Sequence, residues 1–397
     1  MPSSMVRLSS CIFSNLQEVA PMNQPEKIIV RTADASEEKN SSDGYVVNDD
    51  VPAISILIPI YNTERYLEQA LDSLHVQTFT NFEAICINDG STDGSRDIIQ
   101  KYLDKDSRFR VIDKPNSGYG ASMNQGIANA RGEYIGILEP DDFLEPNALD
   151  LLITNAQQHN ADVVKANYWF YWSEPEEHNQ LISVIKPEMA NRTLDPQQDP
   201  DIYLALPSIW SAIYRREYLI KNNIKFLETP GASFQDLGFT FKIWAYTHNV
   251  YLLENPILHY RQDNEASSVN NPDKAFCVCA ELEEIERVLQ TLPNKDQLKP
   301  YVYRMKYDNY MWNYQRLSAE LRKQFLKRMV VDLKAGKENG EYNPSIFGSW
   351  QGKNLEYLLK KPEEFQKKFP INPSKAQKAW YYFKLGGPKL LIDALNR

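Results

Sequence analysis

The feature that most constrains the fold is a regular alternation of apolar runs and amphipathic segments between residues 51 and 159. The run VPAISILIPIYN is rich in β-branched residues and is typical of a strand buried on both faces. Helical spacing follows over Glu64 to Gln77, and NFEAICIN predicts a second strand. The same patterns predict helices near 94–103 and 120–130, and strands near 109–112 and 134–138. The alternation predicts an α/β fold, Rossmann-like, with a mostly parallel sheet and helices on both faces.

The two ends of the chain differ from this middle part. Residues 1–50 become polar and acidic after Glu26 and predict a mobile leader. An irregular polar insert is expected over about 173–201, and after about residue 270 the pattern is mostly helical and charged. We therefore expect a leader (1–50), a catalytic domain (51–270) and a helical C-terminal region (271–397).

Composition excludes several classes of protein. A formal charge of −9 argues against a general nucleic-acid binder, and no apolar run is long enough to cross a bilayer. Four cysteines in 397 residues are too few for a disulfide framework, which favours a reducing, cytoplasmic location. The Cys277-x-Cys279 pair lacks zinc-type spacing, so we assign it no role.

Polar clusters follow each of the four predicted strands. They read PIYNTE, NDGSTDGS, DKPNSGYGASMN and EPDD. Because ligands bind at the carboxyl ends of parallel strands, these clusters are expected at one edge of the sheet. The position after the first strand lacks the glycine fingerprint of dinucleotide-binding folds, and a phosphate-binding P-loop is also missing from the sequence. The predicted site therefore handles its ligand with carboxylates.

The acidic cluster at the fourth strand combines Glu139, Asp141 and Asp142. Carboxylates repel phosphates directly, so their natural partner here is a divalent cation that bridges to a diphosphate. The alternative is structural, because Asp142 followed by Pro146 could simply cap the next helix.

The quoted motifs together resemble the nucleotide-binding half of family 2 glycosyltransferases, which have the A-type glycosyltransferase fold. The resemblance runs from ISILIPIYNTE through NDGSTDGS to EPDD, weakens over 151–205, and returns at PSIWSAIYRREYL and GASFQDLGFTFKIW. The family's acidic motif usually begins with aspartate, whereas this chain has Glu139. The resemblance implies an inverting transferase with a UDP-sugar donor and Mn²⁺ or Mg²⁺ as cofactor. Asp141 and Asp142, with a smaller share for Glu139, are its implied metal ligands.

The resemblance also implies which residues contact the nucleotide-sugar. The expected contacts are Pro59, Tyr61, Glu64, Asp89, Asp93, Gly118, Asn124 and Asp141.

The same resemblance implies a general base. In the family this is the aspartate of a Glu-Asp or Gln-Asp pair, matched here by Gln235-Asp236, with Gln235 on the acceptor side. On spacing alone, Asp236 could equally be the N-cap of the apolar helix that follows.

Further contacts are implied nearer the end of the predicted domain. Arg261 with Ser267 or Ser268 would close over the leaving diphosphate, and His259 is an alternative contact that could instead be packed. Trp210 resembles the family's acceptor-side wall, although a core tryptophan is equally compatible.

The resulting expectation is sugar transfer from a UDP-sugar to a hydroxyl of a cell-surface polysaccharide or lipid-linked glycan precursor. A sugar nucleotidyltransferase would need a glycine-rich, basic loop where PIYNTE stands. A catalytically silent relative that binds glycan or scaffolds an assembly complex is the remaining alternative. The segment KAQKAWYYFKLGGPKLLIDALNR has five basic residues and one acidic residue among aromatics, which suits a contact at the inner face of the membrane. A helix packed on the catalytic domain is its structural alternative.

Overall fold

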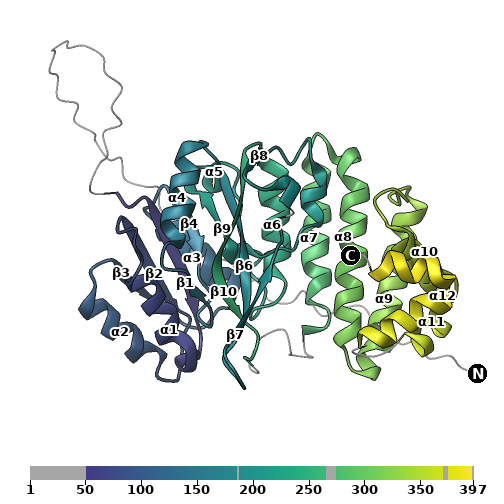
Figure 1. Cartoon of the computed structure of the whole chain (residues 1–397), viewed down its shortest axis with the longest axis horizontal. Helices are drawn as coiled ribbons and strands as arrows, with labels where there is room; N and C mark the ends of the chain where they lie inside the picture. Colours follow the sequence, from purple (N-terminus) through teal and green to yellow (C-terminus); the bar gives the residue numbers. More distant parts are fainter. Residues whose placement is uncertain (1–50, 186, 265–273, 370–373, 396–397) are drawn as a thin grey trace, which may run out of the picture. The chain divides into compact units, whose positions relative to one another are not determined.

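The computed structural model describes residues 51–185, 187–264, 274–369 and 374–395. These residues form an α/β fold with a mixed sheet, followed by a helical C-terminal region, which confirms the predicted fold class (Figure 1). The strands are β1 (Ile54–Ile60), β2 (Phe82–Asn88), β3 (Phe109–Asp113), β4 (Tyr134–Ile137), β5 (Phe143–Leu144), β6 (Val163–Trp172), β7 (His178–Ile182), β8 (Arg192–Leu194), β9 (Ala212–Arg215) and β10 (Val250–Arg261). The helices are α1 (Glu64–His75), α2 (Ser95–Lys105), α3 (Tyr119–Asn129), α4 (Ala148–Gln158), α5 (Arg216–Lys221), α6 (Gln235–Tyr246), α7 (Cys277–Thr291), α8 (Lys295–Arg316), α9 (Ala319–Glu338), α10 (Ser349–Lys360), α11 (Pro362–Lys368) and α12 (Lys375–Leu395).

The sheet has the strand order β3-β2-β1-β4-β9-β6-β10-β5. The first four of these strands are parallel, as the alternation of strands and helices predicts. Strand β9 then runs antiparallel to both β4 and β6, while β6 and β10 pair in parallel. The predicted polar insert contributes β7 and β8, which pair with β6 and β10. The second half of the sheet is therefore mixed.

The side chains of β1 alternate between the two faces of the sheet. Ile54, Ile56, Ile58 and Ile60 belong to the core beneath α1, α2 and α4, whereas Leu57 packs with the opposite core beneath α3 and α6. All seven residues of β1 are buried, as expected for a strand covered by helices on both sides. The carboxyl ends of β1, β2 and β4 consequently open onto one edge, where the polar clusters lie.

The C-terminal helices continue from one face of this sheet. Helix α6 contacts α7, α7 contacts α8, and α8 contacts α9, so these helices stand in sequence beside the sheet (Figure 1). One hydrophobic cluster includes Met123 of α3, Phe239 of α6, Tyr307 of α8 and Leu355 of α10. The boundary expected near residue 270 falls within 265–273, outside the described residues. The helical region thus shares its core with the face of the sheet that carries α3 and α6.

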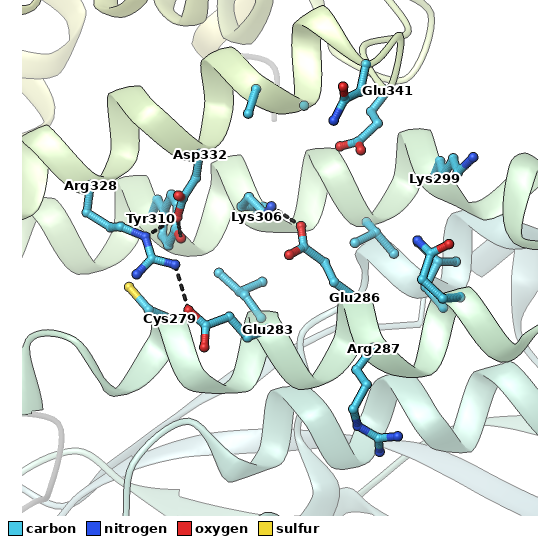
Figure 2. A pocket seen from close by; sticks show the side chains of 17 residues that line it. Cys279, Glu283, Glu286, Arg287, Lys299, Lys306, Tyr310, Arg328, Asp332 and Glu341 are labelled. Carbon is cyan, nitrogen blue, oxygen red and sulfur yellow. Dashed lines mark hydrogen bonds and ion pairs between the residues drawn. The ribbon is translucent and has the colours of Figure 1, made fainter. Parts of the chain in front are cut away.

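A cavity of about 520 Å³ lies between α7, α8 and α9 (Figure 2). Five of its charged side chains pair with one another. Arg328 donates to Asp332 and Glu283, and Lys306 pairs with Glu286. The polar residues that follow the strands do not line this cavity, because all of its lining residues belong to the helical region. Within the described ranges, no helix is both long enough and apolar enough to cross a bilayer.

Candidate functional site

The acidic motif follows β4 as a tight turn, in which the Asp142 amide donates to the Glu139 carbonyl at 3.1 Å. The Tyr119 hydroxyl donates to Glu139 Oε1 at 2.6 Å. Burial raises the pKa of Glu139 to about 8, although the bond from Tyr119 opposes the shift, and the nearby charges of Asp141 and Asp236 add to it. Burial and the neighbouring carboxyl groups at this edge of the sheet therefore disfavour the ionised form of Glu139.

Asp142 is the most deeply buried carboxylate of the motif, with 1% of its surface exposed. Its Oδ1 accepts a hydrogen bond from the Arg261 amide at 2.9 Å, while its Oδ2 is buried without a hydrogen-bond partner among the described residues. Burial and the neighbouring charge of Asp141 raise its pKa well above the usual range. The N-cap of α4 is Asn147, so the interpretation of Asp142 as a helix cap is wrong.

Asp141 is half-buried, and its Oδ2 accepts a hydrogen bond from Asn264 Nδ2 at 2.8 Å. The three carboxylates of the motif do not converge on one point, because no cluster of three potential ligands occurs in the described part of the chain. Joint coordination by Glu139, Asp141 and Asp142 is therefore not observed. One or two hard carboxylates completed by substrate phosphates and water still fit Mg²⁺ or Mn²⁺, and the unpartnered Asp142 Oδ2 agrees with such a site.

Arg261 is hydrogen-bonded to the acidic motif through both its backbone and its side chain. Its side chain is 3% exposed, its Nε donates to the Asp141 carbonyl at 3.0 Å, and its Nη1 donates to Ser173 Oγ at 3.2 Å. The guanidinium also lies over the rings of Tyr66 and Tyr171, at 4.6 and 4.9 Å. Arg261 is thus engaged within the protein, and it positions the backbone of the acidic motif.

The other residues expected around the diphosphate are placed differently. Ser267 and Ser268 lie outside the described residues. His259 stacks on Phe143 at 4.3 Å, and its Nε2 and Nδ1 lie 3.0 and 2.9 Å from oxygens of Glu145 and Asn179. Both ring nitrogens are therefore occupied, as in a packed histidine.

Asp236 lies in the first turn of α6 and is half-buried. The N-cap of this helix is Phe234, whose φ of 60° places it in the left-handed region, so the interpretation of Asp236 as the N-cap is wrong. Burial raises the pKa of Asp236 to about 6, although its Oδ1 accepts the Leu237 amide at 2.9 Å, a bond that opposes the shift. A strained residue two positions before a carboxylate of raised pKa is typical of a functional site.

Gln235, expected on the acceptor side, is 2% exposed. Its Nε2 donates to Thr229 Oγ1 at 2.9 Å and to the Gly231 carbonyl at 3.0 Å, and its Oε1 accepts the Ser233 amide. All of these bonds lie within the loop before α6. The side chain therefore shapes the loop that carries Asp236.

Three of the expected nucleotide contacts connect β2 and α3 to that same loop. Asp89 accepts the amides of Ser117 at 2.8 Å and Gly118 at 2.9 Å. Gly118 has φ +90°, and a Cβ there would lie 3.0 Å from the Gly231 nitrogen. Asn124 donates to the Phe226 carbonyl at 3.0 Å and accepts the Phe226 amide at 2.8 Å. These residues form a frame between the first strands of the sheet and the segment that leads to Asp236.

The remaining expected contacts surround the first strand. The Glu64 amide donates to Asp93 Oδ2 at 3.0 Å, and Glu64 Oε2 accepts the Gly94 amide at 2.6 Å. The two carboxylates therefore tie the starts of α1 and α2 together. Pro59 is buried in β1, whereas Tyr61 is 50% exposed at the sheet edge and is free to meet a planar ligand.

Trp210 is half-buried, so it fits neither a fully buried core residue nor a fully exposed wall. Its ring packs on Tyr168 at 4.4 Å and on Tyr260 at 4.8 Å. Beneath this cluster the buried Lys165 donates to Ser211 Oγ at 2.7 Å. Trp210 is therefore both packed in the core and adjacent to the site.

Sequence reasoning missed several residues of the site. Tyr119 holds Glu139, Asn264 holds Asp141, and Tyr260 lies close enough to the carboxylates of the motif to have its pKa raised by them, in addition to the larger effect of burial. Tyr119 stands between two glycines in SGYGAS and Tyr260 directly precedes Arg261, which are weak signals. Both tyrosines depend on contacts between segments far apart in the sequence.

The amino-acid sequence matches a known family and several of its members. The sequence profile of glycosyl transferase family 2 matches residues 55–222. The chain is 31% identical over 220 residues to the uncharacterized glycosyltransferase EpsJ of Bacillus subtilis (strain 168). The aligned region covers 54% of this chain and 62% of EpsJ. It is 41% identical over 103 residues to the hyaluronan synthase of Pasteurella multocida. The aligned region covers 26% of this chain and 11% of the synthase. The chain spans 61% and 62% of the lengths of EpsH and EpsJ of B. subtilis.

The fold also matches solved structures. Residues 1–349 of S. aureus TarS in complex with UDP-GlcNAc align with a TM-score of 0.61 at 19% identity, covering 82% of this chain and 92% of that one. The same fragment of TarS in complex with UDP gives the same TM-score. At this level of identity the likeness establishes a shared fold.

Proposed function

This chain belongs to the family 2 glycosyltransferases, and on that premise we propose that it transfers a sugar from a UDP-sugar, with inversion, to a hydroxyl of a cell-surface polysaccharide or lipid-linked glycan precursor. One observation carries the proposal: Asp236, a carboxylate with a pKa raised to about 6, lies close to an acidic motif at the edge of the sheet. A base and a diphosphate-binding edge are the two elements that such a displacement needs.

The proposed chemistry assigns distinct tasks to these groups. Asp236 accepts the proton of the acceptor hydroxyl as its oxygen attacks the anomeric carbon, and the bond to the diphosphate oxygen breaks. Asp141 and Asp142 would hold Mn²⁺ or Mg²⁺ together with phosphate oxygens; when bound, the cation supplies positive charge that stabilises the leaving diphosphate. Arg261 keeps the Asp141 backbone in place.

The side chains around the nucleotide follow from the same arrangement. The exposed ring of Tyr61 is the platform proposed for the uracil. Asp89, Gly118 and Asn124 act by fixing the loop that carries Asp236. Trp210 is proposed as the inner part of the acceptor-side wall, because it packs directly on Tyr260.

A peripheral contact with the inner face of the membrane is proposed for α12. Trp380 and Phe383 are 58% and 40% exposed and stack at 5.7 Å, and Lys384 Nζ lies 4.8 Å from the Trp380 ring centroid. Exposed aromatics beside lysine suit an anionic lipid surface. Such a contact would bring the site to a lipid-linked acceptor, and it implies a cytoplasmic protein.

Thermal unfolding with UDP, GDP and NAD, each with and without Mn²⁺, tests the proposed donor. A ligand at about one hundred times its Kd adds roughly 2.7 kcal/mol to the free energy of unfolding. We expect UDP with Mn²⁺ to raise Tm most, and Asp141→Asn to remove the dependence on Mn²⁺. Stabilisation by GDP alone would overturn the donor class. No stabilisation by any nucleotide would favour the silent relative that binds glycan.

A further inference from the structure

The C-terminal end of α8 lies next to the loop that carries Asp236. Trp312 is 46% exposed, and its ring meets that of Phe234 edge-to-face, with centroids 5.6 Å apart. Phe234 is the left-handed N-cap of α6, two residues before Asp236. An aromatic side chain from the helical region is therefore presented to solvent beside the proposed base.

Arg316 lies one helical turn further along α8. Its guanidinium carbon lies 3.6 Å from the centroid of the Trp312 ring. The side chain is half-buried, and its Nε and Nη1 are buried without a hydrogen-bond partner among the described residues. Although Arg316 ends the helix, these two nitrogens do not cap its carbonyl groups. A buried cation left in this state is costly unless an anion meets it.

The environment of Arg316 connects it to the catalytic edge. Burial lowers its pKa to about 10, and the neighbouring Tyr260 opposes that shift. Tyr260 in turn lies close to the carboxylates of Asp142, Asp141, Glu139 and Asp236. Arg316 thus stands between Trp312 and a tyrosine that borders the proposed site.

We propose that Trp312 and Arg316 of α8 form the outer acceptor subsite and select an acceptor sugar that carries a negative charge. The exposed indole provides a face for the sugar ring, and the guanidinium provides a positive charge and its Nη2, which is not among the buried atoms, as a donor to an oxyanion. The subsite lies on the Asp236 side, where the attacking hydroxyl must sit, whereas the diphosphate edge is served by Asp141 and Arg261. This inference rests on the proposed function and narrows its acceptor to a carboxylate-bearing or phosphate-bearing sugar.

The test compares three acceptors that share one ring: methyl β-glucoside, its uronic acid and its 6-phosphate. UDP release is measured from whichever UDP-sugar the protein turns over, together with Tm of the UDP-loaded protein in the presence of each probe. Loss of a charge-assisted hydrogen bond costs on the order of tenfold. We therefore expect at least one charged probe to exceed the glucoside by about that factor in kcat/KM and to raise Tm. Arg316→Gln should remove both advantages.

Two variants control for charge and for folding. Lys323→Gln on α9 removes one exposed positive charge and should retain the preference. Because Arg316 Nε and Nη1 have no hydrogen-bond partner to lose, Arg316→Gln loses only the stacking on Trp312 and should remain folded, with a small decrease in Tm. Trp312→Ala should raise KM for all three probes and leave the Kd for UDP unchanged.

The outcomes separate this inference from the proposed function. Three results would overturn the subsite. The wild type could show equal kcat/KM and Tm with charged and neutral probes, or no change with any probe while UDP binds. Arg316→Gln could also bind UDP more weakly than the wild type. Failure of the wild type to bind UDP or to consume any UDP-sugar would instead overturn the proposed function. The carboxylate and phosphate arms identify which anion the subsite takes.

Discussion

At Asp236 two opposing effects set the charge of a single carboxylate. Burial disfavours the ionised form, whereas the Leu237 amide at the start of α6 favours it. Burial is the stronger effect, and the pKa rises to about 6. A base of this strength remains ionised at neutral pH and accepts a proton more readily than an unshifted aspartate. The left-handed Phe234 keeps the carboxylate at its place in the first helical turn.

Asp236→Asn separates catalysis from binding. The amide keeps the size of the side chain but cannot accept the proton, so we expect transfer to fall by about 10² to 10⁴-fold. Titration calorimetry should give a Kd for UDP within about twofold of the wild type, because the uracil platform and the diphosphate edge are untouched. Parallel loss of transfer and UDP binding would mean that Asp236 is a structural residue.

The pH dependence follows from the same group. Because the ionised form of Asp236 is the active one, kcat/KM should rise with pH and reach half of its plateau near pH 6. Below that midpoint the rate should fall about tenfold per pH unit, as for a single ionisation. A pH profile measured at saturating Mn²⁺ checks this expectation. A midpoint near pH 4, the value for an exposed aspartate, would contradict the account of burial.

Among the elements, α3 and the segment before α6 are in close contact. A Cβ at Gly120 would lie 2.2 Å from the Leu227 carbonyl oxygen, so only glycine allows this approach. Asn124 then bonds both backbone groups of Phe226 and donates to Glu228 at 2.9 Å. These contacts fix the segment before α6, and with it Asp236, relative to α3.

Asn124→Ala should weaken this connection. Leaving the Phe226 backbone groups without partners costs about 1 to 3 kcal/mol in the free energy of unfolding, which urea denaturation measures. Asn129→Ala is the matched control, since this exposed side chain on the same helix bonds, among the described residues, only to the Gln125 carbonyl. Transfer should also decline in Asn124→Ala, because the loop to Asp236 loses its anchor. Equal stability in the two variants would contradict the connecting role.

The elements of the first half were predictable because each carries a local signal. Strand β1 is apolar at every position except Ser55, α1 has helical spacing, and the short polar turn at residues 61–63 separates them. The antiparallel placement of β9 and the pairing of β7 with β6 have no such signal. They depend on which sheet edge is left open once the other strands have paired.

At the scale of the whole molecule, the helical region is part of the site's surroundings. Its core is shared with α3 and α6, and its helix α8 buries polar side chains such as Arg304, Lys306 and Asn313 among tyrosines. Helix α8 has no distinct apolar face, so the spacing of its apolar residues does not predict which side chains are buried. The resemblance identified Asp141 and Asp236 as candidates, but it could not reach Trp312 or Arg316, which meet the site only in three dimensions.

In the proposed reaction the carboxylate edge and Asp236 perform one direct displacement on a UDP-sugar. The anomeric configuration of the product tests this directly, read by proton NMR during turnover of an α-linked UDP-sugar with a glycoside acceptor. Direct displacement gives a β-linked product formed in step with UDP. An α-linked product would contradict the inverting role of Asp236, and neither product nor UDP would contradict the claim of transfer itself.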